Sequence, residues 1–186
     1  RRIYLNLFLV DIIVREEFQG KLRIFPSWEM SITKVVGRKR RKLRGKHDYT
    51  IGFGQGWDPF GHKTPPKELP LVAIEGKRNW DGMDIWQCVA EAATIFRARK
   101  DMKKANCSVW GVLINAINWM FIHIDEDGKL YISKLFVLDV LDCTDEELLF
   151  IYRLMYHVVD QCFRACISPG SEESWSVADD VENEDN

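Results

Sequence analysis

Apolar residues at helical spacing occur in three stretches of the chain. They predict helices over residues 3–18, 85–102 and 144–166. In the first stretch, Leu5, Leu9 and Ile12 share one face. Asp84 is a suitable N-cap for the second helix, and the third begins with a capping box.

Shorter apolar or alternating runs predict strands. They cover residues 22–25, 28–36, 48–53, 70–77, 108–115, 118–125 and 129–135, and the last two form a hairpin. The residues between the third and fourth strands, 54–69, are rich in Gly and Pro and are predicted to form an exposed loop. Residues 37–46 have no hydrophobic period and are predicted to be a turn or loop. The order of elements predicts an α/β fold with a mixed central sheet and flanking helices.

Composition indicates one globular domain followed by an acidic tail. The chain has 186 residues, of which 46% are hydrophobic and 12% aromatic, enough to build a proper core. We expect the domain to cover residues 1–167. Residues 168–186 are acidic and are predicted to be disordered. No apolar run reaches the length of a membrane span.

Cysteine usage suggests an intracellular protein. Five cysteines, an odd number with no Cys-x-x-Cys pair, are interpreted as reduced thiols. The chain begins with Arg1 and no Met, so it could be a fragment from which a targeting sequence is missing. Oligomeric state is left open, with a second copy or another protein as alternative partners.

The predicted strand over residues 70–77 is apolar until it ends in Glu75-Gly76-Lys77. Side chains alternate along a strand, so Glu75 and Lys77 face the same way, and Gly76 allows a close approach to the backbone. On the preceding strand, Asp48 and Thr50 face away from the apolar positions. Gln87 lies near the start of the following helix. Taken singly, these residues also fit a surface ion pair, a turn cap and a solvent-facing amide.

The order Asp48, Glu75-x-Lys77 and Gln87 resembles the PD-(D/E)XK, or restriction-endonuclease-like, nuclease superfamily over about residues 1–135. The resemblance implies an αβββαβ core, here with an added C-terminal helix, and an active site where the two central strands diverge. It implies that Asp48, Glu75 and the carbonyl of Gly76 bind Mg²⁺ or Mn²⁺, since hard cations prefer oxygen ligands.

The same resemblance assigns the remaining roles. Lys77 would orient the attacking water and offset charge on the phosphate, and Gln87 would position that water or Lys77. A further metal ligand is implied near the first helix. Glu17, with Glu16 next, and Glu29 are alternatives for it.

Seven cations lie between residues 37 and 46. They are Arg38, Lys39, Arg40, Arg41, Lys42, Arg44 and Lys46. Such a run attracts phosphates whatever the base sequence, and we expect it to flank the cleft and bind nucleic acid, with DNA favoured. A nuclear localisation signal and a solvated loop are the alternatives.

Two narrower likenesses concern other parts of the chain. The run 89–93, the strand to Asn115 and Trp119-Met120-Phe121 resemble the nuclease-type domains of fungal and oomycete Crinkler-like proteins, which implies a nuclear setting. The glycines around Phe53 are spaced like those of a kinase Gly-rich loop, but no HRD or DFG sequence follows, so we reject a kinase. The sequence therefore favours a metal-dependent nuclease, and the alternative is a catalytically inactive nuclease-like fold that binds nucleic acid or protein.

Overall fold

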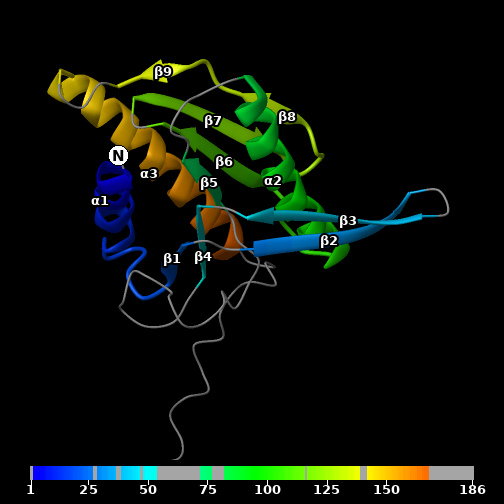
Figure 1. Cartoon of the computed structure of the whole chain (residues 1–186). Coiled ribbons are helices and arrows are strands. Elements are labelled where there is room, and N and C mark those ends of the chain that lie inside the picture. The colour runs from blue at the N-terminus through cyan, green and yellow to red at the C-terminus, as the bar shows by residue number, and fades with distance from the viewer. Residues whose placement is uncertain are drawn as a thin grey trace, which may run out of the picture.

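A computed structural model describes residues 2–26, 29–36, 39–46, 48–53, 72–76, 82–115, 117–138 and 142–167 (Figure 1). The helices are α1 (Arg2–Ile13), α2 (Gly82–Asp101) and α3 (Asp145–Ile167). The strands are β1 (Leu22–Pro26), β2 (Glu29–Val36), β3 (Lys39–Lys46), β4 (Tyr49–Phe53), β5 (Val72–Gly76), β6 (Val109–Ile114), β7 (Asn118–Ile124), β8 (Leu130–Ile132) and β9 (Phe136–Val137). Residues 1, 54–71 and 168–186 are among those outside the described residues, so the predicted loop and acidic tail fall there.

Seven strands form one mixed sheet. Its order is β1-β4-β5-β6-β7-β8, with β9 also paired to β7. Neighbouring strands are antiparallel except β5 and β6, which run parallel and are connected through α2. A parallel pair needs such a crossover, because a tight hairpin can join only antiparallel strands. The predicted α/β fold with a mixed sheet is confirmed.

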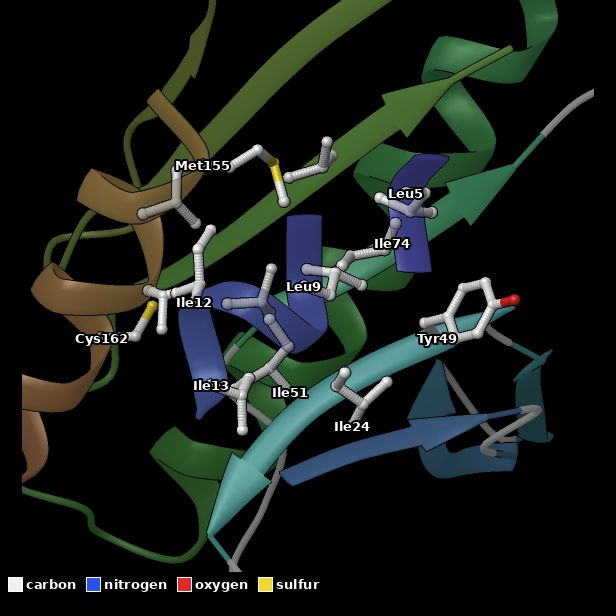
Figure 2. Packing of buried hydrophobic residues seen from close by; sticks show 14 of the residues in the cluster. Leu5, Leu9, Ile12, Ile13, Ile24, Tyr49, Ile51, Ile74, Met155 and Cys162 are labelled. Atoms are coloured by element: carbon white, nitrogen blue, oxygen red, sulfur yellow. The ribbon is translucent and has the colours of Figure 1, made fainter. Parts of the chain in front are cut away.

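The helices cover the two faces of this sheet (Figure 1). The larger core joins α1 and α3 to one face, where Leu9, Ile12, Ile74 and Met155 are fully buried (Figure 2). On the other face, α2 packs through two smaller apolar clusters, one of which contains Ala73. Each buried Leu or Ile contributes about 1.5–3 kcal/mol of transfer free energy, so both faces depend on their helices.

The helix boundaries partly follow the predictions. The capping box of α3 is confirmed. The backbone N–H of Thr144 donates to Glu147 Oε2 at 2.9 Å, and the backbone N–H of Glu147 donates to Thr144 Oγ1 at 3.2 Å. Helix α1 ends at Ile13 rather than at residue 18. The chain turns there because Phe18 is buried against α3, with its ring 5.2 Å from that of Phe163. Asp84 lies within the first turn of α2, so the predicted N-cap is wrong.

Six of the seven basic residues lie in a strand, so the predicted turn or loop is wrong for residues 39–46. Residues 37 and 38 lie outside the described residues. Strand β3 pairs antiparallel with β2 from Lys39 opposite Val36 to Lys46 opposite Glu29. This ribbon lies outside the main sheet, and its two strands satisfy each other's backbone groups without an apolar period in β3. Both strands contact α2, and Figure 1 shows the ribbon projecting to one side of the molecule.

Candidate functional site

Asp48 lies immediately before β4, beside the end of β5. The two strands pair with Tyr49 opposite Ile74, and continuing this register places Asp48 opposite Glu75. The backbone N–H of Gly76 donates to Asp48 Oδ2 at 2.9 Å. A Cβ added to Gly76 would lie 3.3 Å from the same oxygen, so the glycine permits this close approach. The structure thus holds one carboxylate against the last residue of β5.

Glu75 faces α2. Its neighbours Val72 and Ile74 enter the core shared with α1 and α3, whereas Ala73 packs against α2, so alternation puts Glu75 on the α2 face. The Glu75 side chain is only 5% exposed, and Gln87 Nε2 donates to its Oε1 at 3.1 Å. Strand β5 and helix α2 therefore bring together two of the predicted site residues, Glu75 and Gln87.

Glu91 is a member of this cluster that the sequence interpretation missed. Gln87 Nε2 also donates to Glu91 Oε1 at 3.0 Å, and Glu91 is 5% exposed. The available signal was the spacing of four residues on α2, which puts Gln87 and Glu91 on one helix face. The surrounding alanines and valine also mark an acidic residue set in an apolar part of the helix.

Thr50 adds a buried hydroxyl to the face that carries Asp48. Its side chain is fully buried, and within the described part of the chain its Oγ1 has no hydrogen-bond partner. An unsatisfied buried hydroxyl costs about 1–3 kcal/mol, a cost that a bound water or ion can remove. All the carboxylate and hydroxyl groups of this face are hard oxygen donors, which suit Mg²⁺ or Mn²⁺. Among the described residues, no group of three or more His, Cys, Asp or Glu is arranged to hold a metal ion.

Several predicted functional groups lie outside the described residues or are described only in their backbone. Lys77 and Arg38 are outside them. The structure gives the backbone course of Glu29 at the start of β2 and of the basic residues in β3, and of these side chains it describes Lys39, which is exposed.

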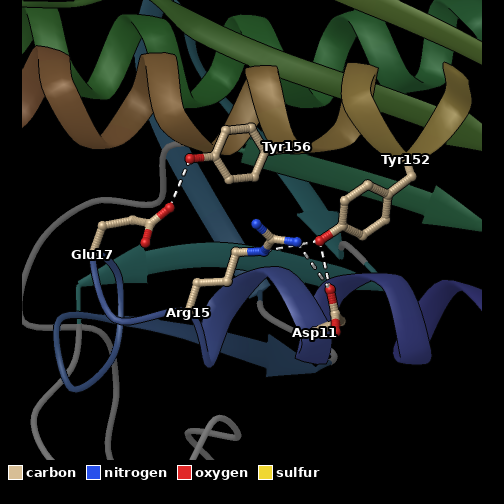
Figure 3. A network of polar contacts seen from close by, with 5 residues as sticks. All are labelled: Asp11, Arg15, Glu17, Tyr152 and Tyr156. Atoms are coloured by element: carbon tan, nitrogen blue, oxygen red, sulfur yellow. Dashed lines mark hydrogen bonds and ion pairs between the residues drawn. The ribbon is translucent and has the colours of Figure 1, made fainter. Parts of the chain in front are cut away.

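Glu17 lies on the other side of the sheet (Figure 3). It follows α1, and Tyr156 of α3 donates a hydrogen bond to its Oε1 at 2.7 Å. This bond lowers the pKa of Glu17 below its usual value. The structure does not bring Glu17 together with Glu75, because α1 and α3 cover the face opposite to α2. Glu16, on the same turn, is exposed.

A cavity of about 460 Å³ lies away from the carboxylates of Asp48, Glu75 and Glu91. Residues of β9 and of the start of α3 line it, among them Val137 and Phe150. It shares no residue with the cluster of Asp48, Glu75, Gln87 and Glu91.

The four cysteines whose side chains are described are free thiols. None of the helices described is long and apolar enough to cross a membrane.

Comparison with protein-family models gives no match, and neither does comparison with curated proteins. Among solved structures, the chain is similar to one described as the crystal structure of SSO0001, at 10% sequence identity and a TM-score of 0.28. The match covers 91% of this chain and 60% of that chain. A likeness this weak supports no argument about fold or function. The argument for a function therefore rests on the site itself.

Proposed function

We propose that the protein is a divalent-metal-dependent nuclease. The observation that carries this proposal is a pair of contacts at the end of β5: Asp48 accepts a hydrogen bond from the backbone of Gly76, and the adjacent Glu75 accepts one from Gln87 of α2. Glu75 is 5% exposed and accepts a hydrogen bond from Gln87, which supplies part of the compensation that a buried carboxylate needs. Perturbed or buried carboxylates of this kind are concentrated at functional sites.

The oxygen donors present are of the type that a hard divalent cation prefers. Asp48 and Glu75 would hold it through carboxylate oxygens, together with the carbonyl of Gly76. When bound, such an ion polarises a phosphodiester and lowers the pKa of a bound water. Gln87 keeps the Glu75 carboxylate in one orientation through its 3.1 Å hydrogen bond. Lys77, the next residue after β5, would orient the attacking water and offset the charge that builds on the phosphate.

The basic ribbon supports a nucleic-acid substrate, and we propose DNA. Strands β2 and β3 contact α2, so the cations of β3 lie on a ribbon that packs against the helix that also carries Gln87. Cations at this density attract the phosphate backbone independently of sequence. The same run would serve as a nuclear localisation signal.

Cleavage of labelled duplex and single-stranded DNA and RNA, with Mg²⁺, with Mn²⁺ and with chelator, tests the proposal. We expect Asp48→Asn and Glu75→Gln to lower cleavage by about 10²–10³-fold or more, because each removes charge from the metal site. Glu126→Gln, an exposed change in the β7–β8 turn, is the matched control and should leave cleavage intact. Activity that persists in chelator would overturn the mechanism.

A nucleic-acid-binding module without catalysis is the second candidate. The basic ribbon favours it, because β3 could bind phosphates whether or not the carboxylates hold a metal. Binding that is strong in the wild type, with Mn²⁺ bound and no cleavage of any substrate, would select this candidate.

A further inference from the structure

One amide nitrogen joins two buried carboxylates on the α2 face of the sheet. Gln87 Nε2 donates to Glu75 Oε1 at 3.1 Å and to Glu91 Oε1 at 3.0 Å. The two glutamates are each 5% exposed and come from different elements, Glu75 from β5 and Glu91 from α2. Both N–H groups of the amide are therefore directed to carboxylate oxygens.

The chemistry of these groups determines which way the Gln87 amide points. An ionised carboxylate only accepts hydrogen bonds, and an amide oxygen also only accepts. Turning the Gln87 amide over would place its oxygen against the oxygens of both glutamates. The reversed orientation would therefore bring the amide oxygen against two carboxylates, and the repulsion from Glu91 adds to the repulsion from Glu75. Glu91 also anchors the amide from the same helix, one turn away, where the backbone keeps the two side chains adjacent.

We propose that Glu91 is a positioning residue that fixes the Gln87 amide with its nitrogen toward Glu75, and through it fixes the Glu75 carboxylate. Its effect on metal binding rests on the proposed function, whereas the hydrogen-bond relay exists without it. Groups that orient a metal ligand typically change metal affinity by about 10–100-fold when removed. Glu91 does not touch the metal or the substrate in this scheme and acts only through Gln87.

Glu91→Gln tests the relay because it keeps the shape of the side chain and removes its charge. A glutamine at this position can donate as well as accept, so it no longer selects one orientation of Gln87. The first measurement is nitrogen-15 NMR of the side-chain amide of Gln87, assigned by its loss in Gln87→Ala. Gln87 is exposed, so any protection of its protons must come from these hydrogen bonds. We expect the protons to exchange with water at least several-fold faster in Glu91→Gln than in the wild type. Unchanged exchange would overturn the proposal, whatever the protein's activity.

The second measurement is a double-mutant cycle on Mn²⁺ affinity by calorimetry. We expect Glu91→Gln and Gln87→Ala each to weaken binding about tenfold, and the double variant to bind no more weakly than Gln87→Ala. If Glu91→Gln weakens binding equally in the Gln87→Ala background, Glu91 does not act through Gln87 and the proposal fails.

Controls separate this relay from general damage and from the proposed function. Urea unfolding identifies a variant that has lost its fold, and Glu91→Asp, which keeps the charge but shortens the reach, then replaces Glu91→Gln with the same expected losses. Glu126→Gln should leave both measurements unchanged. A wild type that binds no Mn²⁺ would sink the proposed function, while the NMR measurement would still decide the relay.

Discussion

Asp48 and Gly76 are joined by a 2.9 Å hydrogen bond from the backbone N–H of Gly76 to Oδ2 of Asp48. This bond crosses from the start of β4 to the end of β5 and fixes the Asp48 carboxylate beside Glu75. Its partner residue has no side chain, and a Cβ there would lie 3.3 Å from the carboxylate oxygen. The position of Asp48 therefore depends on the glycine between the charged residues of the motif.

Gly76→Ala should displace Asp48 by a few tenths of an ångström, because the new methyl group is too close to Oδ2. We expect Mn²⁺ affinity and cleavage to fall about tenfold, since small misplacements of reacting groups are costly. Calorimetry and single-turnover cleavage measure the two effects. An unchanged Mn²⁺ affinity would show that metal binding does not depend on where Asp48 lies.

Gly128→Ala is the matched control for this substitution. Gly128 has a φ of 85° in the β7–β8 turn, where alanine is strained. We expect it to lower the free energy of unfolding by about 1 kcal/mol without altering Mn²⁺ binding. A loss of Mn²⁺ affinity in both variants would indicate general destabilisation instead of a displaced carboxylate.

Much of this site follows from alternation along two strands. Tyr49, Ile51 and Phe53 enter the core with α1 and α3, so Asp48 and Thr50 were correctly placed on the opposite face. The pairing of β4 with β5, continued by one residue, then places Asp48 opposite Glu75. Such features are readable because apolar burial determines which face each residue takes.

Other features could not be read from local patterns. Strand β3 has no apolar period, and its formation depends on backbone pairing with β2, a contact that periodicity does not detect. Glu17 was a candidate ligand because a helix pattern does not say which face of a later sheet the helix will cover. Glu91 was missed because an isolated acidic residue in a helix is ordinarily exposed, and its burial arises only when α2 packs over Glu75.

Lys77→Ala should separate catalysis from metal binding. Lys77 supplies no metal ligand in the proposed mechanism, so we expect cleavage to fall by about 10²–10³-fold. Mn²⁺ affinity should stay the same or rise, because removing a nearby positive charge favours a cation. Parallel cleavage assays and calorimetry on one preparation check this, and a large loss of Mn²⁺ binding would contradict the assignment.

The free energy of unfolding should fall at alkaline pH because of Tyr152, which joins α3 to Asp11 of α1 (Figure 3). Burial, then the hydrogen bond to Asp11, raises the pKa of Tyr152 to about 12. The pKa of a tyrosine in an unfolded chain is about 10, so the folded state favours the protonated phenol. This stability is complete below about pH 10 and is lost as pH rises toward the folded pKa of about 12. Urea unfolding between pH 9 and 12 should show a decline attributable to Tyr152 that is absent in Tyr152→Phe.

Tyr156→Phe should change how the free energy of unfolding depends on acidic pH. The hydrogen bond from Tyr156 lowers the pKa of Glu17, so Glu17 contributes stability above its unfolded pKa that is lost as pH falls through the lower folded value. Removing the phenol should flatten this acid-side dependence and leave the Tyr152 contribution in place. An unchanged acid profile would mean that the bond to Glu17 does not persist in solution.

The basic ribbon should set the salt dependence of nucleic-acid binding. Replacing Arg38, Arg40, Arg41 and Arg44 with alanine removes four cations, three of which lie in β3. Each phosphate contact contributes about 0.9 to the slope of log affinity against log salt on duplex DNA, so we expect the slope to flatten by up to about 3–4. Affinity should fall for all sequences alike, because phosphate contacts carry no base information. Lys129→Ala with Lys134→Ala, exposed changes beside β8, should leave the slope unaltered. Titrations of labelled DNA across a salt series measure the slope, and equal slopes for wild type and the ribbon variant would assign the cations to transport or solubility instead.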